Sequence, residues 1–147
     1  KLQVAIKMNY LKILFLVNTI LIINNSLQAK NNFLNEGKIL FENEKYSEAK
    51  FKFEKEIVYN PKNENAYLYL AKIFNKEKKN NLEENNLNTV LLLNPKNEEA
   101  IYFLTLLKIN KSNFSQAKEL ISNFNSICEK LCSRGSELED KLINSLK

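Results

Sequence analysis

Histidine is absent from the 147-residue sequence, and arginine and aspartate occur once each, as Arg134 and Asp140. Without histidine there is no His-based triad, no histidine general base and no histidine metal ligand. Nucleic-acid grooves recruit arginine, and the lysines here alternate with glutamates, a pattern typical of a solvated helix face. We therefore expect no enzyme, no cofactor, no metal site and no nucleic-acid partner.

Glycine and proline are also scarce, with two of each. That number is too small for the many turns of a β-sandwich or barrel. The hydrophobic content of 44% is sufficient for a packed core. The composition therefore favours an all-α fold.

The N-terminal segment 1–29 has the pattern of a secretory signal peptide, with a possible start at Met8. A basic start leads into the apolar run 13–23, and Ala29 is the small residue at the expected cut. The alternative is a membrane anchor over residues 11–29, although a spanning helix needs about 20 apolar residues. We expect a periplasmic or secreted protein that meets the membrane only through this segment if it stays uncleaved. Without the lysines at positions 1, 7 and 12, the formal charge of +5 falls to +2.

A 34-residue repeat organises the remaining chain. Pro61 and Pro95 lie one such period apart, within two matching Asn-Pro-Lys-Asn-Glu strings. The period divides the chain into units 30–63, 64–97 and 98–131, followed by a segment at 132–147. In the second unit, apolar residues recur at one face of a helix, and a polar run separates this helix from a second one. Each unit is therefore predicted to be a helix-turn-helix that must stack on its neighbours.

These residues resemble the tetratricopeptide repeat (TPR) of exported bacterial proteins. The resemblance rests on the 34-residue period and on residues shared between units: Gly37/Ala71, Ala49/Ala117 and Pro61/Pro95. It implies a right-handed solenoid of three helical hairpins. Glu83 stands where the other units have Ala49 and Ala117, so looser packing is expected in the second unit.

The C-terminal segment has its own helix signal. Ser136 and Glu139 form a capping box, and Gly135 before them is typical of a helix stop. The pattern predicts a helix from Ser136 to Leu146 that covers the last apolar face of the solenoid.

Cys128 and Cys132 are the only cysteines, in a C-x-x-x-C spacing. They are too few for a zinc site, and a reactive cysteine would lack its histidine. In an oxidising compartment a mutual disulfide is favoured, with a break in the helix between them. Two free, partly buried thiols are the alternative. Similar C-x-x-x-C endings occur in envelope-located repeat proteins of the family that the chain resembles.

In that family, the first helix of each unit lines a concave groove that takes an extended peptide or a helix. The resemblance therefore implies a set of partner-contacting positions on the three first helices: Leu34, Lys38, Phe41, Leu68, Lys72, Asn75, Lys76, Tyr102, Leu106 and Ile109. Some family members clamp a terminal carboxylate with Lys, Asn and Arg, and several of those places are here occupied by other residues: Leu34, Tyr69, Glu99 and Phe103.

Tyr102, Leu106 and Ile109 form a second apolar stripe on a helix that already has one packing face. Such a stripe is covered by a partner, by the C-terminal helix or by a second copy of the chain. The expected function is a non-enzymatic scaffold that binds a peptide or helix of another envelope polypeptide. The alternative is a self-associating structural subunit, or an accessory subunit of an envelope complex, with the stripe as its interface.

Overall fold

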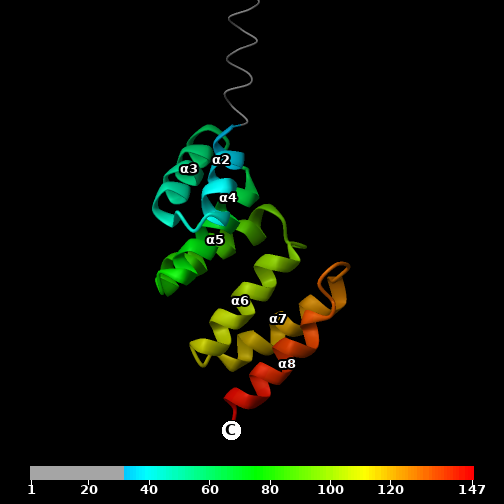
Figure 1. Ribbon diagram of the computed structural model, residues 1–147. Coiled ribbons are helices and arrows are strands. Elements are labelled where there is room, and N and C mark those ends of the chain that lie inside the picture. The colour runs from blue at the N-terminus through cyan, green and yellow to red at the C-terminus, as the bar shows by residue number, and fades with distance from the viewer. Residues whose placement is uncertain (1–31) are drawn as a thin grey trace, which may run out of the picture.

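The computed structural model describes residues 32–147, so the expected signal peptide at 1–29 and the alternative anchor at 11–29 lie outside the described residues. Over this range the chain forms helices and no strand (Figure 1). The helices are α2 (Asn32–Glu42), α3 (Tyr46–Tyr59), α4 (Glu64–Lys76), α5 (Asn80–Leu93), α6 (Glu98–Asn110), α7 (Phe114–Ile127) and α8 (Arg134–Ser145).

The helices pair as three antiparallel hairpins, α2–α3, α4–α5 and α6–α7, one in each predicted repeat unit. Consecutive hairpins stack, because α3 contacts α4 and α5 contacts α6. The last helix, α8, contacts both α6 and α7 at the far end of the stack from α2 (Figure 1). The described residues are thus all-α, as the composition predicts.

The core runs through the stack as three apolar clusters, each shared between neighbouring elements. Phe53 is fully buried among α2, α3 and α4, and Leu87 is fully buried among α4, α5 and α6. The third cluster joins α6, α7 and α8 around Phe124 and Leu138. Because each cluster takes side chains from a hairpin and the element that follows it, no hairpin buries its apolar face alone.

The turn inside each hairpin repeats with the same period. Glu44, Lys78 and Ser112 are equivalent positions of the three units, and all have a left-handed backbone with φ between 56° and 59°. In each turn the following amide donates to a carbonyl of the preceding helix, as Lys79 does to Phe74 at 2.9 Å. This is the usual hydrogen-bonded ending of a helix at a left-handed residue, here without the glycine that such a position favours.

Gly37 lies where α2 meets α3, as expected of a small residue at a close packing point. A Cβ atom at Gly37 would lie 2.6 Å from Cε1 of the fully buried Phe53 ring. Helices α4 and α5 contact each other as the other paired helices do, with Glu83 of α5 buried, and looser packing in the second unit stays a prediction.

The predicted start of the last helix is wrong. Helix α8 begins at Arg134, because the amides of Arg134 and Gly135 already donate to the carbonyls of Leu131 and Cys132. Gly135 is therefore no helix stop: it lies buried in the first turn of α8, where a Cβ atom would collide with Oδ1 of Asn125 on α7. Ser136 does not cap the helix either, since its hydroxyl donates to the carbonyl of Ser133.

Candidate functional site

Aromatic and charged side chains from the first helices of the three hairpins gather on one side of the stack. We call this group the first-helix surface: Lys38 and Phe41 of α2, Tyr69 and Lys72 of α4, and Glu99 and Phe103 of α6. The repeat brings them together, because Lys38 and Lys72 are equivalent positions of neighbouring units, as are Tyr69 and Phe103. Each of the six side chains is half-buried, so all of them are partly accessible.

Tyr69 is the centre of this surface. Its ring stacks on the buried Phe53 ring at a centroid distance of 4.9 Å and meets the edge of Phe41 at 5.2 Å. The ammonium groups of Lys38 and Lys72 lie 5.6 Å and 4.7 Å from its centroid. Each cation–aromatic contact contributes about 0.5–1 kcal/mol at an accessible site, so the lysines have preferred positions over the ring.

Lys72 links α4 to α6. Its ammonium group lies 2.6 Å from Oε1 of Glu99 and 5.8 Å from the centroid of Phe103. Burial, together with the charges of Glu99 and Glu42, raises the pKa of the Tyr69 hydroxyl. Tyr69 therefore stays protonated at neutral pH and can donate a hydrogen bond from the first-helix surface.

The surface carries groups suited to holding a polypeptide. Its rings offer apolar contact area, its lysines attract carboxylates, and Tyr69 and Glu99 offer a hydrogen-bond donor and an acceptor. Within residues 32–147 no group of three or more Cys, Asp or Glu side chains is arranged to hold a metal ion. None of the helices in that range is long and apolar enough to cross a bilayer.

Three of the predicted contact residues are not on an open surface. Leu68, Tyr102 and Ile109 are buried, with 4–6% of their surface exposed. Leu68 packs in the cluster between α4, α5 and α6, while Tyr102 and Ile109 pack in the cluster that α8 completes. The half-buried Leu106 packs against that same cluster. The second apolar stripe is thus covered by the C-terminal helix, one of the coverings that the sequence left open.

The other predicted contact residues are more accessible. Lys38, Phe41 and Lys72 belong to the first-helix surface, and Leu34 is half-buried beside it against the core of the first hairpin. Asn75 and Lys76 lie exposed at the end of α4, where the Asn75 amide donates to Oε1 of Glu83 at 3.0 Å. The contacts around Tyr69 therefore bring Lys38, Phe41 and Lys72 together, and Asn75 and Lys76 follow Lys72 at the end of the same helix.

Two members of the first-helix surface, Tyr69 and Phe103, were recognised in the sequence only as replacements at clamp positions. The signal that could have found them is the repetition of an aromatic residue at 69 and 103, one period apart and beside the lysine at 72.

A hydrogen-bonded group joins α6 to α8 next to this surface. The Tyr102 hydroxyl donates to Oε1 of Glu137 at 2.9 Å and accepts from Nη1 of Arg134 at 3.0 Å. The Arg134 guanidinium also lies 4.8 Å from the Tyr102 ring centroid. Burial and the bond to Glu137 raise the pKa of Tyr102. Tyr102 is thus engaged with α8 through both its ring and its hydroxyl.

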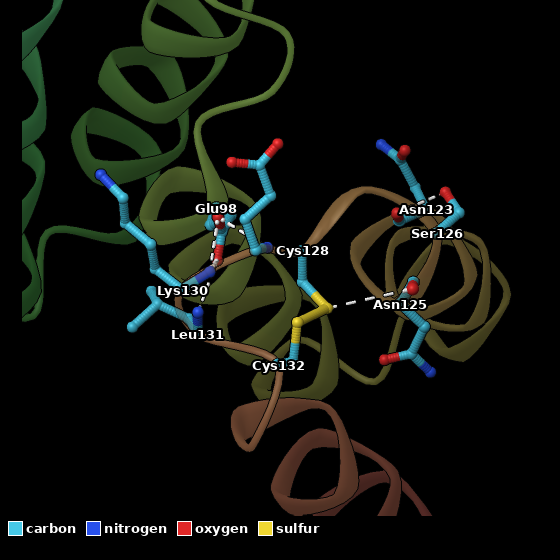
Figure 2. Close-up of a disulfide and its surroundings, with 9 residues drawn as sticks. Glu98, Asn123, Asn125, Ser126, Cys128, Lys130, Leu131 and Cys132 are labelled. Carbon is cyan, nitrogen blue, oxygen red and sulfur yellow. Dashed lines mark hydrogen bonds between the residues drawn. A yellow bond between two sulfur atoms is a disulfide. The ribbon is translucent and has the colours of Figure 1, made fainter.

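The structure joins Cys128 and Cys132 in a disulfide, with their Cα atoms 5.2 Å apart (Figure 2). The helix breaks between them, as expected of a disulfide at this spacing. Figure 2 shows Glu98, from the start of α6, directed at the backbone of the loop. Its two carboxylate oxygens accept from the amides of residues 129, 130 and 131 at 2.6–3.2 Å.

Desolvation alone would raise the pKa of Glu98, but the backbone bonds from Leu131, Glu129 and Lys130 together outweigh it and lower that pKa. The carboxylate is therefore charged at neutral pH, the form that accepts these bonds.

Comparison with protein-family models and with curated protein sequences finds no match. Solved structures do match. The first TPR domain of Spaghetti (RPAP3), bound to the HSP90 peptide SRMEEVD, has a TM-score of 0.72 at 18% identity, covering 82% of this chain and 95% of that one. The TPR2B domain of yeast Sti1 in complex with pHsp70 has a TM-score of 0.70 at 15% identity, covering 80% and 95%.

The Sgt2 TPR domain from Aspergillus fumigatus has a TM-score of 0.67 at 16% identity, covering 80% of this chain and 81% of that one. At these identities the likeness establishes the fold. The described chain therefore has the fold of a TPR solenoid, with three helical hairpins followed by a C-terminal helix.

Proposed function

We propose that this protein is a non-enzymatic scaffold that binds a segment of another cell-envelope polypeptide on its first-helix surface. The observation that carries the proposal is the cluster around Tyr69, where first helices of all three hairpins contribute rings and charges to one accessible group. The TPR resemblance assigns these helices to the concave side of the solenoid.

Two structural neighbours support the binding of a polypeptide. One was solved with an HSP90 peptide and another as a complex with pHsp70, on a fold that covers most of this chain. The residues that meet the ligand need not be the same, because Tyr69, Glu99 and Phe103 replace the clamp residues of some family members. The ligand class proposed here is therefore a polypeptide segment, without a required terminal carboxylate.

The envelope location rests on two features of the chain. The residues before Lys30 have the pattern of an export signal, and a disulfide is stable in an oxidising compartment. Self-association through Tyr102, Leu106 and Ile109 is not proposed as a second function, because α8 covers that stripe.

A crosslinking pull-down from envelope extract tests the proposal. The protein is compared with a Lys38→Gln/Lys72→Gln variant, which removes both charges over Tyr69 without adding bulk. The matched control is Lys118→Gln on the exposed side of α7. We expect the wild type and the control to recover the same partner and the double variant to lose it. Equal recovery by all three proteins would refute the assignment of the surface.

A further inference from the structure

Apolar side chains of α6 and α7 together form the surface on which α8 packs, and we call this surface the α6–α7 cleft. Leu138 is fully buried and Leu142 is 6% exposed, one helical turn apart on α8. They pack against side chains of both cleft helices: Ile101, Tyr102, Ile109, Ile121 and Phe124. The present occupant, α8, shows what kind of helix the cleft accepts.

Polar contacts at the edge of the cleft fix the direction in which α8 lies. Glu137, directly before Leu138, accepts from the Tyr102 hydroxyl at 2.9 Å. On the α7 side, Glu139 accepts from the Asn125 amide at 2.9 Å. A helix with an acidic residue, a leucine directly after it and a second leucine four residues later can make the same contacts in the cleft. In a helix that runs in the opposite direction, the carboxylate of the acidic residue would not lie at the Tyr102 hydroxyl.

The loop that connects α7 to α8 contains the disulfide. Only the residues between Ile127 and Arg134 connect α7 to α8, and the disulfide fixes the ends of most of this connection (Figure 2). Glu98 holds the three amides inside the loop. Cys132 is exposed and Cys128 is half-buried, so Cys132 is the more accessible residue of the disulfide.

We propose that the α6–α7 cleft is a second binding site, for an amphipathic helix of the α8 type from another polypeptide, and that the Cys128–Cys132 disulfide controls access to it. With the disulfide formed, α8 stays in the cleft. With the disulfide reduced, α8 leaves more often and a partner helix with the Glu-Leu-x-x-x-Leu pattern takes its place. This inference does not depend on the proposed function of the first-helix surface.

The reductant belongs to the chemical class of dithiols. One thiolate of the dithiol attacks Sγ of Cys132, the bond between the sulfurs breaks, and Cys128 leaves as a thiolate that takes up a proton. The second thiol of the reductant then attacks the mixed disulfide and frees Cys132. Two electrons and two protons pass to the protein, which gains two thiols, and the reductant becomes a disulfide.

The size of the effect follows from the loop. When α8 is out of the cleft, the disulfide still restricts the conformations of the loop that it closes. For so short a loop, this loss of entropy lowers the equilibrium constant for α8 leaving the cleft by about 30-fold. Reduction is therefore expected to raise the fraction of molecules with α8 out of the cleft by about 30-fold. The apparent dissociation constant of a competing helix falls by the same factor, because it varies inversely with the open fraction.

The test uses the full chain, with and without dithiothreitol, and a fluorescently labelled synthetic peptide of residues 133–147. Anisotropy measures peptide binding, and hydrogen exchange of the α8 amides measures opening. A Cys128→Ser/Cys132→Ser variant reproduces the reduced state without reductant. The matched control peptide carries Leu138→Ala and Leu142→Ala, and the exchange of α4 and α5 reports whether the rest of the fold is intact.

We expect reduction to accelerate α8 exchange by about 30-fold, to lower the apparent dissociation constant of the peptide by a similar factor and to leave α4 and α5 unchanged. The double serine variant should behave like the reduced protein, and the control peptide should not bind. A less than threefold change in peptide binding would overturn the proposal, whether or not exchange accelerates. A reduced protein that forms dimers and takes up no peptide would overturn it in favour of self-association.

Discussion

Replacement of Glu83 by methionine is expected to stabilise the protein. Glu83 stands where the other two hairpins have the fully buried Ala49 and Ala117, and only 1% of its surface is exposed. Oε1 accepts from the Asn75 amide at 3.0 Å, while Oε2 is buried with no hydrogen-bond partner among the described residues. A buried polar atom left without a partner costs about 1–3 kcal/mol.

Methionine has a similar length and no polar atom, and the exposed Asn75 amide can return to water. We therefore expect Glu83→Met to raise the free energy of unfolding by about 1–3 kcal/mol at pH 7. Chemical denaturation followed by circular dichroism measures this change. The control is Glu119→Met at an exposed position of α7, where a change within about 0.5 kcal/mol is expected.

The stabilisation that we expect from Glu83→Met should depend on pH. The pKa of Glu83 is raised above its ordinary value of 4.5, mainly by burial. The hydrogen bond from Asn75 lowers this pKa, and the negative charge of Glu84 raises it further. The folded state therefore holds more protons than the unfolded state between that ordinary value and the raised one, so wild-type stability falls as pH rises through this window.

Above the raised pKa, this loss of stability reaches its full extent. The stability difference between Glu83→Met and wild type should thus be smallest below the ordinary carboxyl pKa of 4.5, grow as pH rises and then level off. A variant that is less stable than wild type at pH 7, or a difference that does not change with pH, would refute the account of Glu83 as a desolvated carboxylate.

Four further substitutions test the packing and one turn, each by denaturation. Gly37→Ala should destabilise the protein by about 1–3 kcal/mol, because its Cβ atom would meet the buried Phe53 ring at 2.6 Å, whereas Gly135→Ala meets only the movable end of Asn125 and should cost less. An equal cost at both glycines would contradict this. Lys78→Gly should stabilise by about 0.5–1 kcal/mol by relieving a left-handed backbone, and a loss of stability would be the opposite result. Leu138→Ala should cost about 2–5 kcal/mol, since the side chain is fully buried under α6 and α7, and a neutral effect would mean that α8 is not docked in solution.

The repeated positions made the hairpins predictable. Pro61 and Pro95 mark the ends of two units, and the spacing of small and apolar residues around them indicates both helices of each hairpin. The left-handed turn residues were not recognisable, because Glu44, Lys78 and Ser112 are three different residue types and none is glycine. Their conformation is imposed by the helix-ending hydrogen bonds instead of by local preference.

The C-terminal helix was harder to place because two local signals pointed to a later start. Gly135 is typical of a helix stop, yet here its missing side chain gives room to Asn125. The loop closed by Cys128 and Cys132 starts the helical hydrogen bonds earlier than the serine signal suggests. Both effects arise from tertiary contacts, which a sequence pattern does not contain.

The first-helix surface was predicted only in part for a similar reason. Tyr102, Leu106 and Ile109 form the same apolar pattern whether a partner or α8 covers them, so the residues alone could not separate these cases. Lys38 and Lys72 were found by their repeat positions, whereas the importance of Tyr69 follows from the buried Phe53 beneath its ring.

The central claim is that the first-helix surface, and not another face, meets the partner polypeptide. A photo-crosslinking residue placed at the exposed Glu42, near Tyr69, tests this directly against the same residue at Leu92 on α5, which is 83% exposed. We expect a discrete crosslinked partner from position 42, its loss on Lys72→Gln, and no such product from position 92. A partner crosslinked equally from both positions, or from position 92 alone, would contradict the account.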